Sequence, residues 1–501
     1  MAKAYLGIDI GTYETKGALV AADGEVLASA KRAHRMLVPR PGWAEHRAEE
    51  DWWQDFVAVS RDLIAAGGVA PQEIRAVAAS GIGPCVLPVD KSGAPLTNAI
   101  LYGVDTRAMR EIRELTEALG GARIFEACGN ALTSQSVGPK ILWLKRNRPE
   151  VFDRAHKFLN STSFLVHRLT GRFVVDHYTA ANASPLYSAE RLEWSDALTA
   201  EIAPLDRLPE LAWTTEIAGG VTAQAAAATG LAAGTPVIVG TIDAAAEAVS
   251  VGVIEPGEMM LMYGSTIFTI LVASSRLRDA RLWWAPWLFA GQHAWLAGLA
   301  TSGACTRWFV DQLVRDLAGE EAFDRLTREA AASPAGARGL MFLPYFSGER
   351  TPIHDPHAKG LWFGLTLAHD RADMFRALIE GIAHATRHIF DTYSQAGAAL
   401  GAIRAVGGGL RNPVWTQATA DICGGSQEMT KQRLGACYGD AFLAALGVGE
   451  VRKADIRRWN PVTERVAPNA ANAPRYARQH EIFLALYQRT RDLMTRLEED
   501  A

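Results

Sequence analysis

The sequence predicts an α/β protein built from two lobes of similar design. Short β-rich runs alternate with segments whose apolar residues recur at helical spacing. Two β-hairpins with small-residue turns lie about 250 residues apart. The chain has 501 residues, and single hydrophobic cores stop growing near ~250–300 residues. We therefore expect the strands and helices to be divided between two compact lobes.

The first predicted lobe covers residues 1–246 and opens with a hairpin. Its predicted strands are residues 6–10 and 17–20, with a turn at 11–15. Asp23-Gly24 predicts a second turn into a third strand. The remaining predicted elements are an amphipathic helix at 49–65, strands at 74–79 and 236–240, and helices at 107–119, 140–147 and 244–249.

The second predicted lobe covers residues 247–460. We place the boundary near 246–256, because Glu255-Pro256-Gly257 interrupts the periodic pattern. Residues 461–501 form a predicted tail that ends in a helix at 475–498. The other predicted elements are a hairpin at 259–273, helices at 306–317 and 374–393, a strand at 403–406, a glycine-rich turn at 407–409 and a helix from residue 414.

Composition and charge disfavour several classes of function. The net charge of −4 and the short, isolated basic clusters argue against a nucleic-acid surface. Five scattered cysteines without a C-x-x-C pair indicate a reducing compartment, with neither a disulfide framework nor a zinc site. The N-terminus leads into a strand and not into a signal sequence. The most apolar stretch, residues 282–300, is interrupted by proline, glycine and polar residues, so we interpret it as interior structure. We expect a cytoplasmic protein that binds neither nucleic acid nor membranes.

The turn of the first hairpin carries groups that can hold a phosphate. Gly11 permits a close approach of the backbone to a ligand. Exposed N–H groups, the hydroxyls of Thr12 and Thr15, and the Lys16 ammonium are suitable phosphate donors. Asp9, at the end of the preceding strand, is a hard oxygen ligand suited to Mg²⁺. An ordinary hairpin, whose polar side chains satisfy their own backbone, explains the same residues equally well.

Two further glycine-rich elements support the phosphate hypothesis. Gly264, Ser265 and Thr266 offer the same donors in the second hairpin, so two turns facing each other across a cleft would clamp a nucleotide. The three glycines at 407–409 would let the backbone approach a flat ring or a phosphate, although a tight strand-to-helix connection is the alternative. No Walker loop and no complete dinucleotide-binding fingerprint is present, which disfavours a nicotinamide-dependent dehydrogenase.

Asp243 is the candidate for a catalytic carboxylate. It follows the buried run at 236–240 and precedes an alanine-rich helix. Ligand crevices in α/β folds lie at the carboxyl ends of strands. The alternative is a helix N-cap, for which Asp is favoured, and one residue can do both. Residues 81–86, after the predicted strand at 74–79, could line a substrate pocket with backbone groups.

The order of these motifs resembles the FGGY carbohydrate kinases, which belong to the sugar kinase, actin and heat-shock-protein ATPase superfamily. The similarity extends from Tyr5 to about Gly449. Each motif is short, but their joint order is specific. They occupy residues 7–12, 41–45, 51–53, 263–266, 343–352, 407–412 and 417–421. The resemblance implies two ribonuclease-H-like lobes, of the actin and hexokinase type, with ATP and Mg²⁺ bound in a cleft between them.

The resemblance also implies a role for each matching residue. Asp243 corresponds to the family's catalytic base and Asp9 to its magnesium-associated aspartate. The other matches are Gly11, Thr12, Thr15 and Lys16 in the first phosphate turn, Gly264, Ser265 and Thr266 in the second, Gly303, Gly408, Gly409 and Asn412 on the adenosine side, Ile82, Gly83 and Pro84 in the sugar loop, and Asp105 with Arg107 behind that loop.

The xylulokinase-like kinases are the most similar subgroup, so the expected activity is ATP-dependent phosphorylation of a ketopentose such as xylulose. Residues 81–85 read Gly-Ile-Gly-Pro-Cys where xylulokinases typically have Gly-Gln-Met-His, and residues 101–107 depart from Trp-Asn-Asp-x-Arg. Polar contacts determine which hydroxyls are recognised, so ribulose, erythritol and glycerol-like acceptors stay open. A non-catalytic ATP-dependent clamp is the alternative from another class. A homodimer is common among relatives.

Overall fold

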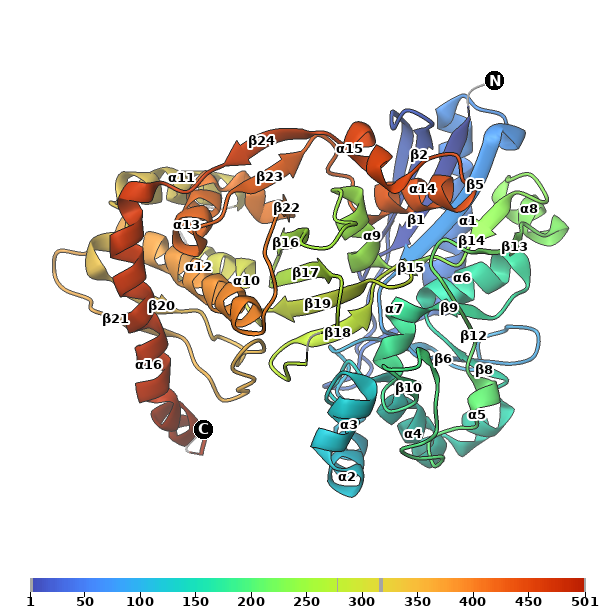
Figure 1. The fold of residues 1–501 in the computed structure, drawn as a ribbon, viewed down its shortest axis with the longest axis horizontal. Helices are drawn as coiled ribbons and strands as arrows, with labels where there is room; N and C mark the ends of the chain where they lie inside the picture. Colours follow the sequence, from blue (N-terminus) through green and yellow to red (C-terminus); the bar gives the residue numbers. More distant parts are fainter. Residues whose placement is uncertain (1–2, 277, 315–318, 500–501) are drawn as a thin grey trace.

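Two seven-stranded sheets form the cores of two lobes (Figure 1). The computed structural model describes residues 3–276, 278–314 and 319–499. The first sheet is built from strands before residue 243 and the second from strands after residue 258. Among the described helices, none combines the length and the apolar composition that crossing a membrane requires.

The first sheet contains the predicted N-terminal hairpin. β1 and β2 pair antiparallel, with Ile10 opposite Thr15, and β5 runs parallel to β1. In spatial order the strands are β13 (Ile217–Gly220), β14 (Pro236–Ile238), β5 (Ile74–Gly81), β1 (Ala4–Ile10), β2 (Glu14–Ala21) and β3 (Val26–Ala33), and β15 (Thr241–Ile242) also pairs with β5.

The strand predicted at 236–240 is interrupted at Gly240. This residue has a φ of +73°, and a Cβ there would lie 2.3 Å from the carbonyl oxygen of Ala79. Only glycine accommodates both the left-handed backbone and this close approach. β14 therefore ends at Ile238, and β15 resumes beside the carboxyl end of β5, which places Asp243 at that edge of the sheet.

Helices pack on both faces of the first sheet. α1 (Asp55–Gly67) packs on β2 and β3 after the π-helical segment Ala48–Gln54, so the helix predicted at 49–65 is present in two parts. α9 (Asp243–Ser250) and α14 (Ala436–Gly447) pack against each other, and α14 contacts β1 and β5. A Cβ at Gly7 would lie 2.0 Å from the Cys437 carbonyl oxygen, so the missing side chain lets α14 approach β1. The helices predicted at 107–119 and 140–147 are α2 (Met109–Leu119) and α4 (Val137–Asn147).

The second sheet repeats the core of the first. β16 and β17 form the predicted hairpin and β22 runs parallel to β16, as β5 does to β1. The apolar stretch at 282–300, which was predicted to be interior structure, supplies two largely buried strands. In spatial order the strands are β18 (Trp283–Pro286), β19 (His293–Gly298), β17 (Ile267–Ala273), β16 (Met259–Tyr263), β22 (Ile403–Val406), β23 (Gln427–Thr430) and β24 (Val462–Val466).

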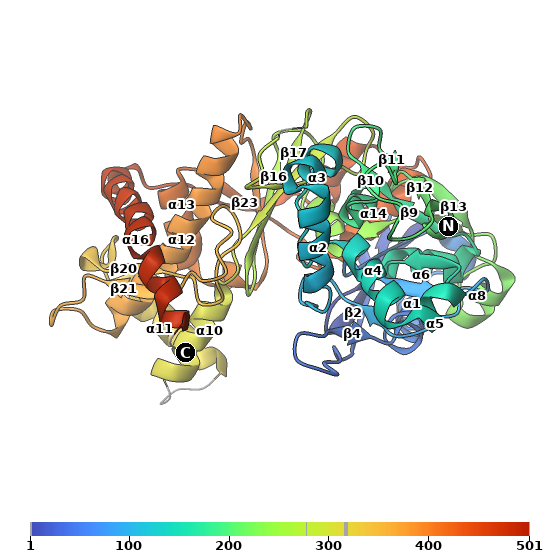
Figure 2. The ribbon, with the colours of Figure 1, turned by 90° about the horizontal axis from the view of Figure 1, so that it is seen from below.

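The second lobe carries most of its helices on the side away from the first lobe (Figure 2). They are α10 (Gly303–Leu313), α11 (Gly319–Ala332), α12 (Arg371–Gln395), α13 (Pro413–Cys423) and α16 (Ala473–Glu499). Of the helix predicted at 306–317, residues 315–317 lie outside the described residues. The predicted lobe boundaries stay predictions: α14, within 247–460, packs on the first sheet, and β24, within 461–501, is an edge strand of the second sheet.

Candidate active site

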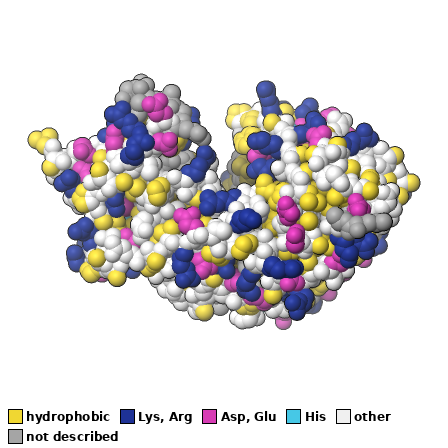
Figure 3. Space-filling model, turned by 90° about the horizontal axis from the view of Figure 1, so that it is seen from above, with side chains coloured by type: hydrophobic (Ala, Val, Ile, Leu, Met, Phe, Trp, Pro, Cys, Tyr) yellow, Lys and Arg dark blue, Asp and Glu magenta, His cyan; other side chains and the backbone are white. Residues whose placement is uncertain are grey.

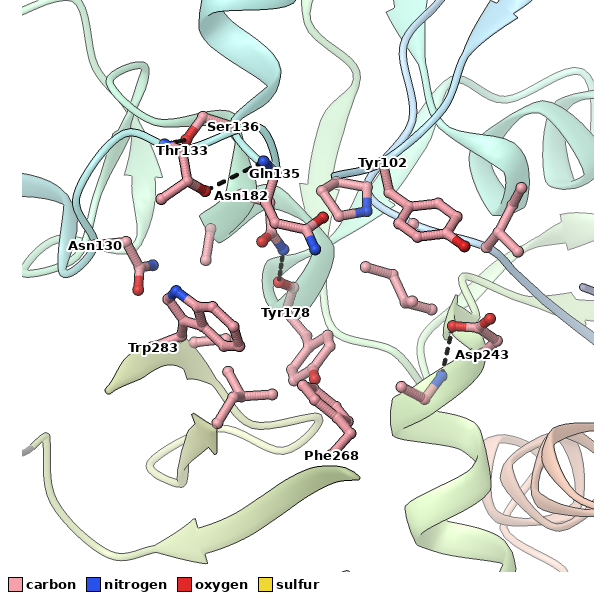
Figure 4. Close-up of a pocket in the computed structure, with 18 of the residues that line it drawn as sticks. Tyr102, Asn130, Thr133, Gln135, Ser136, Tyr178, Asn182, Asp243, Phe268 and Trp283 are labelled. Atoms are coloured by element: carbon pink, nitrogen blue, oxygen red, sulfur yellow. Dashed lines mark hydrogen bonds between the residues drawn. The ribbon is translucent and has the colours of Figure 1, made fainter. Parts of the chain in front are cut away.

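A cavity of about 370 Å³, which we call the central cavity, is lined by both lobes. Figure 3 shows the molecular surface hollowed between the lobes, and Figure 4 shows many of the lining side chains. The cavity brings together residues that are far apart in the sequence. The predicted site residues in its lining are Thr12, Ile82, Gly83, Pro84, Asp243 and Thr266.

Asp243 is the first residue of α9, and its side chain lines the central cavity. Ile242 occupies the N-cap position, so the alternative of a capping Asp243 is wrong. The carboxylate instead accepts the N–H of Ala244 at 2.7 Å (Figure 4). Burial raises the pKa of Asp243 well above its usual range, the charge of Asp9 raises it further, and the Ala244 N–H opposes the shift. A carboxylate of raised pKa in a cavity is a suitable proton acceptor.

Three more carboxylates, those of Asp9, Glu247 and Asp440, interact with Asp243 at this edge of the sheet, and Asp9 also interacts with Glu247 and Asp440. The Ser80 hydroxyl lies 2.6 Å from Asp440 Oδ2 and 3.3 Å from Asp9 Oδ1. Burial raises the pKa of Asp9 to about 6 and that of Glu247 to about 7. Buried carboxylates at this density favour a bound cation.

The donor set suits Mg²⁺. Among the described residues, no three His, Cys, Asp or Glu side chains are arranged to hold a metal ion by themselves. Mg²⁺ does not need such a cage, because it usually binds through one or two carboxylates, water and substrate phosphates. Asp9 therefore fits the predicted role as a magnesium-associated carboxylate.

The first hairpin turn is fixed by bonds within the first lobe. The buried Thr15 hydroxyl donates to Asp55 Oδ2 at 3.1 Å, and Lys16 Nζ lies 2.9 Å from Glu14 Oε1. Burial alone would lower the pKa of Lys16, but the ion pair outweighs it and the pKa is raised. Of the predicted residues in this turn, Thr12 lines the central cavity, whereas Gly11, Thr15 and Lys16 lie outside its lining.

A second cavity, of about 570 Å³, borders the second hairpin turn, and we call it the glycine-lined cavity. Asn412 also caps α13, because its Oδ1 accepts the N–H groups of Val414 at 3.0 Å and Trp415 at 3.2 Å. The Trp415 ring packs against Tyr263, and both line the cavity. The predicted residues gathered in this lining are Gly264, Ser265, Gly303, Gly408, Gly409 and Asn412.

Asp105 and Arg107 pair with each other and lie outside the lining of the central cavity. Arg107 Nη2 lies 2.7 Å from Asp105 Oδ2 and 2.9 Å from Glu45 Oε1, and the guanidinium stacks 3.9 Å from the centre of the Trp43 ring. The backbone N–H of Asp105 bonds the Tyr102 carbonyl oxygen. The pair therefore fixes the segment that carries Tyr102.

Lys140, which was not predicted as a site residue, supports the same segment. Its buried Nζ donates to the carbonyl oxygens of Leu101 at 2.6 Å and Tyr102 at 2.8 Å. Burial lowers the pKa of Lys140 to about 8. The Tyr102 hydroxyl lies 3.1 Å from Thr12 Oγ1, so α4 is connected to the first hairpin turn. The available signal was a lysine among the apolar positions of a predicted helix.

Several other lining residues were also missed. Glu247 follows Asp243 by four residues, so helical periodicity alone places both on one face of α9. No local pattern marks Gln135, Asn182 or Arg350, which are polar side chains from three separate segments. Phe268 and Trp283, from the second sheet, complete the cavity wall opposite Tyr102 (Figure 4).

Asn130 joins the two lobes beside the central cavity. Its Nδ2 donates to the carbonyl oxygen of Trp284, and its Oδ1 accepts the N–H of the same residue, both at 2.8 Å. Asn130 follows α3 (Gly121–Cys128) of the first lobe, whereas Trp284 lies in β18 of the second sheet. Two hydrogen bonds between the Asn130 side chain and the Trp284 backbone thus join the lobes on this side of the cavity.

Models of two domains match most of the chain. The model described as the FGGY family of carbohydrate kinases, N-terminal domain, matches residues 4–250, and the corresponding C-terminal domain matches residues 259–448. The xylulose kinase of Escherichia coli (strain K12) is 31% identical over 496 residues, which cover 98% of this chain and 100% of that protein. The gluconokinase of Bacillus subtilis (strain 168) is 27% identical over 496 residues, with coverages of 96% and 95%.

Solved structures share the fold. The crystal structure of xylulose kinase from Rhodospirillum rubrum matches with a TM-score of 0.92 and 32% sequence identity. The match covers 98% of this chain and 100% of that one. The predicted class, an α/β protein with two sheet-containing lobes of the actin and hexokinase type, is thereby confirmed.

Proposed function

Because the chain belongs to the FGGY family of carbohydrate kinases, we propose that it transfers the terminal phosphoryl group of ATP to a sugar hydroxyl, with Asp243 as the general base. One observation carries this proposal. Asp243 lines a cavity whose walls also include Thr12 and Thr266 of the two hairpin turns and the loop at 82–84. An acceptor hydroxyl in this cavity would meet a carboxylate and both phosphate-binding turns.

Phosphoryl transfer requires positioning and charge neutralisation more than covalent chemistry from the protein. The acceptor oxygen forms a bond to the terminal phosphorus, and the bond from that phosphorus to the bridging oxygen of ADP breaks. Asp243 accepts the hydroxyl proton as this oxygen attacks. We expect Asp9 to hold Mg²⁺, which supplies positive charge to the phosphates when bound.

The glycine-lined cavity is the proposed site of the nucleoside. Gly408 and Gly409 expose backbone, and Trp415 offers an aromatic face beside them. Ser265 and Thr266 are neighbours in one turn, yet Ser265 lines the glycine-lined cavity and Thr266 the central cavity. A triphosphate running from one cavity toward the other would pass this turn, which supports the proposed direction of transfer.

For the acceptor, we propose a ketopentose such as xylulose, as the name of the Escherichia coli relative suggests. The name of the gluconokinase relative makes aldonates a second candidate class of acceptor. Other ketoses and polyols are further candidates. The loop at 82–84 offers backbone and apolar groups, so hydroxyl recognition would depend on Gln135, Asn182 and Tyr102 instead. A carboxylate in the cavity argues against a non-catalytic clamp.

The test is ADP release with Mg-ATP and a panel of xylulose, ribulose, erythritol, glycerol and gluconate. We expect one acceptor to dominate. The Asp243→Asn variant should keep ATP affinity and lose at least ~10²-fold in kcat, because a positioned base contributes that much or more. Near-normal turnover by this variant would refute the role of Asp243. Absence of ADP release by the wild type with every acceptor would refute the kinase proposal for this panel.

A further inference from the structure

Arg350 brings a positive charge from the second lobe into the lining of the central cavity. It lies in the loop between β20 (Met341–Leu343) and β21 (Leu361–Phe363). Neighbouring backbone bonds hold this loop: Glu349 exchanges two bonds with Asp355, at 2.8 and 2.9 Å, and Thr351 N–H bonds the Gly298 carbonyl oxygen in β19 at 3.2 Å. The loop therefore presents Arg350 from a fixed position.

The Arg350 guanidinium makes no hydrogen bond and no ion pair with any residue in the part of the chain that the structure describes. The carboxylate of its neighbour Glu349 bonds backbone groups and not the guanidinium: Glu349 Oε1 accepts the N–H groups of Ala300 at 2.6 Å and of Arg350 at 2.7 Å. Burial raises the pKa of Glu349 to about 8, and the charge of Arg350 opposes this shift. Burial lowers the pKa of Arg350, but a guanidinium stays charged at neutral pH.

A partly buried charge without a partner is costly unless a ligand pairs with it. The guanidinium fork matches the oxygen geometry of a phosphate or a carboxylate. Both acidic residues in the cavity lining, Asp243 and Glu247, lie outside ion-pair distance of Arg350. The missing partner is therefore an anionic group that enters the cavity with the substrates.

The position of Arg350 favours a phosphoryl group over a carboxylate of the acceptor. Arg350 and Tyr102 are close enough to interact electrostatically. Tyr102 in turn contacts Thr12 of the first hairpin turn. In Figure 4, Tyr102 and Asp243 lie at one end of the cavity, whereas Asn130 and Trp283 lie at the other. Arg350 thus belongs to the end where the base and the phosphate turn meet.

We propose that Arg350 is a further catalytic residue, which binds the phosphoryl group as it passes from ATP to the acceptor oxygen. This inference rests on the proposed kinase function. In the transfer, the acceptor oxygen bonds to the terminal phosphorus, ADP leaves with the electron pair of the broken P–O bond, and the acceptor proton goes to Asp243. Arg350 neutralises charge on the transferring group from the second lobe, so the site is complete only when both lobes contribute.

The test compares Arg350→Gln and Arg350→Lys with the wild type. With a neutral acceptor that the wild type uses, we expect Arg350→Gln to lose about 10²-fold or more in kcat, with the KM for ATP changed less than about threefold. Arg350→Lys should recover part of the rate, because it keeps the charge and loses the fork. Arg281→Gln is the matched control, since Arg281 is ion-paired with Asp279 at 2.7 Å and lies outside both cavity linings.

A second measurement does not depend on turnover. Isothermal titration of inorganic phosphate into protein that holds Mg-ADP should show at least about tenfold weaker binding in Arg350→Gln than in the wild type and Arg281→Gln. Unchanged phosphate affinity together with a kcat near that of the wild type would overturn the proposal. So would a loss confined to the KM for gluconate, which would assign Arg350 to an acceptor carboxylate. If no acceptor is phosphorylated by the wild type, the kinase proposal fails, while the phosphate titration still decides whether Arg350 binds the anion.

Discussion

The charge on Asp243 depends on its neighbours as well as on burial. Burial is the largest cause of its raised pKa, and the negative charges of Asp9 and Glu247 raise it further. A base must be ionised to accept a proton, so the rate should fall as the pH drops through this raised pKa. Removing one of the neighbouring charges should therefore extend activity to lower pH.

Glu247→Gln tests this dependence at a single residue. The substitution removes a like charge, so the pKa of Asp243 falls and the acidic limb of the kcat/KM profile should move to lower pH by roughly half a unit, as expected for one screened charge. The measurement is kcat/KM against pH for the variant and the wild type. Glu117→Gln, on the exposed surface of α2, is the control and should leave the limb in place. A limb that stays fixed or moves to higher pH in Glu247→Gln would contradict the electrostatic account.

Some residues of the candidate site could be predicted from the sequence, and others could not. Asp9 and Asp243 are recognisable because each lies at the carboxyl end of a short apolar strand, where α/β proteins place their ligands. Asp440 has no local signal: its contact with Ser80 joins positions 360 residues apart and depends on where α14 packs. Asp105 and Arg107 were predicted behind the sugar loop, and in the structure they pair with each other and with Glu45 outside the lining of the central cavity.

Among the elements, the two hairpins were predictable and the segment before Asp243 was not. Two short apolar runs around a small-residue turn that contains glycine indicate a hairpin locally, and the pairs β1–β2 and β16–β17 follow that pattern. The run at 236–240 reads as one strand because the steric need for Gly240 comes from Ala79 on a neighbouring strand. A local sequence pattern carries no information about contacts between neighbouring strands of a sheet, so the interruption at Gly240 was not predicted.

The start of α13 combines a helix cap with a wall of the glycine-lined cavity. Asn412→Ala removes the acceptor for two backbone N–H groups and should lower the free energy of unfolding by about 1 kcal/mol. Asn412→Asp keeps a capping oxygen, so we expect stability close to that of the wild type but weaker ATP binding, because a new negative charge would face the nucleotide. Urea denaturation followed by circular dichroism and ATP titration measure the two effects. Equal losses of stability in both variants would show that the cap is not the source of the effect.

At the scale of the whole molecule, the two sheets share one plan but the chain crosses between them. Each has a hairpin followed by a parallel strand, and this duplication is visible in the sequence as two similar hairpins. α14 follows β23 of the second sheet and then packs on the first sheet beside α9. Two lobes that are consecutive in the sequence do not include such a crossing. The crossing of α14 is what brings Asp440 to Ser80. The elements around Asp243 therefore come from both ends of the chain.

The lobes also meet on the opposite side of the central cavity, where Asn130 forms two hydrogen bonds with the Trp284 backbone. Asn130→Ala removes both bonds, each of which contributes a net ~0.5–1.5 kcal/mol. We therefore expect the arrangement in which the lobes meet at this point to become less populated and the acceptor KM to rise about tenfold. ATP affinity should change little, because the glycine-lined cavity belongs to the second lobe.

Arg278→Gln is the control: it removes the exposed ion pair with Glu126 across the same boundary, and such surface pairs contribute at most about 1 kcal/mol. Small-angle scattering of the ligand-free proteins should give a larger radius of gyration for Asn130→Ala than for the control. If both the radius and the acceptor KM stay at wild-type values, Asn130 does not hold the lobes together.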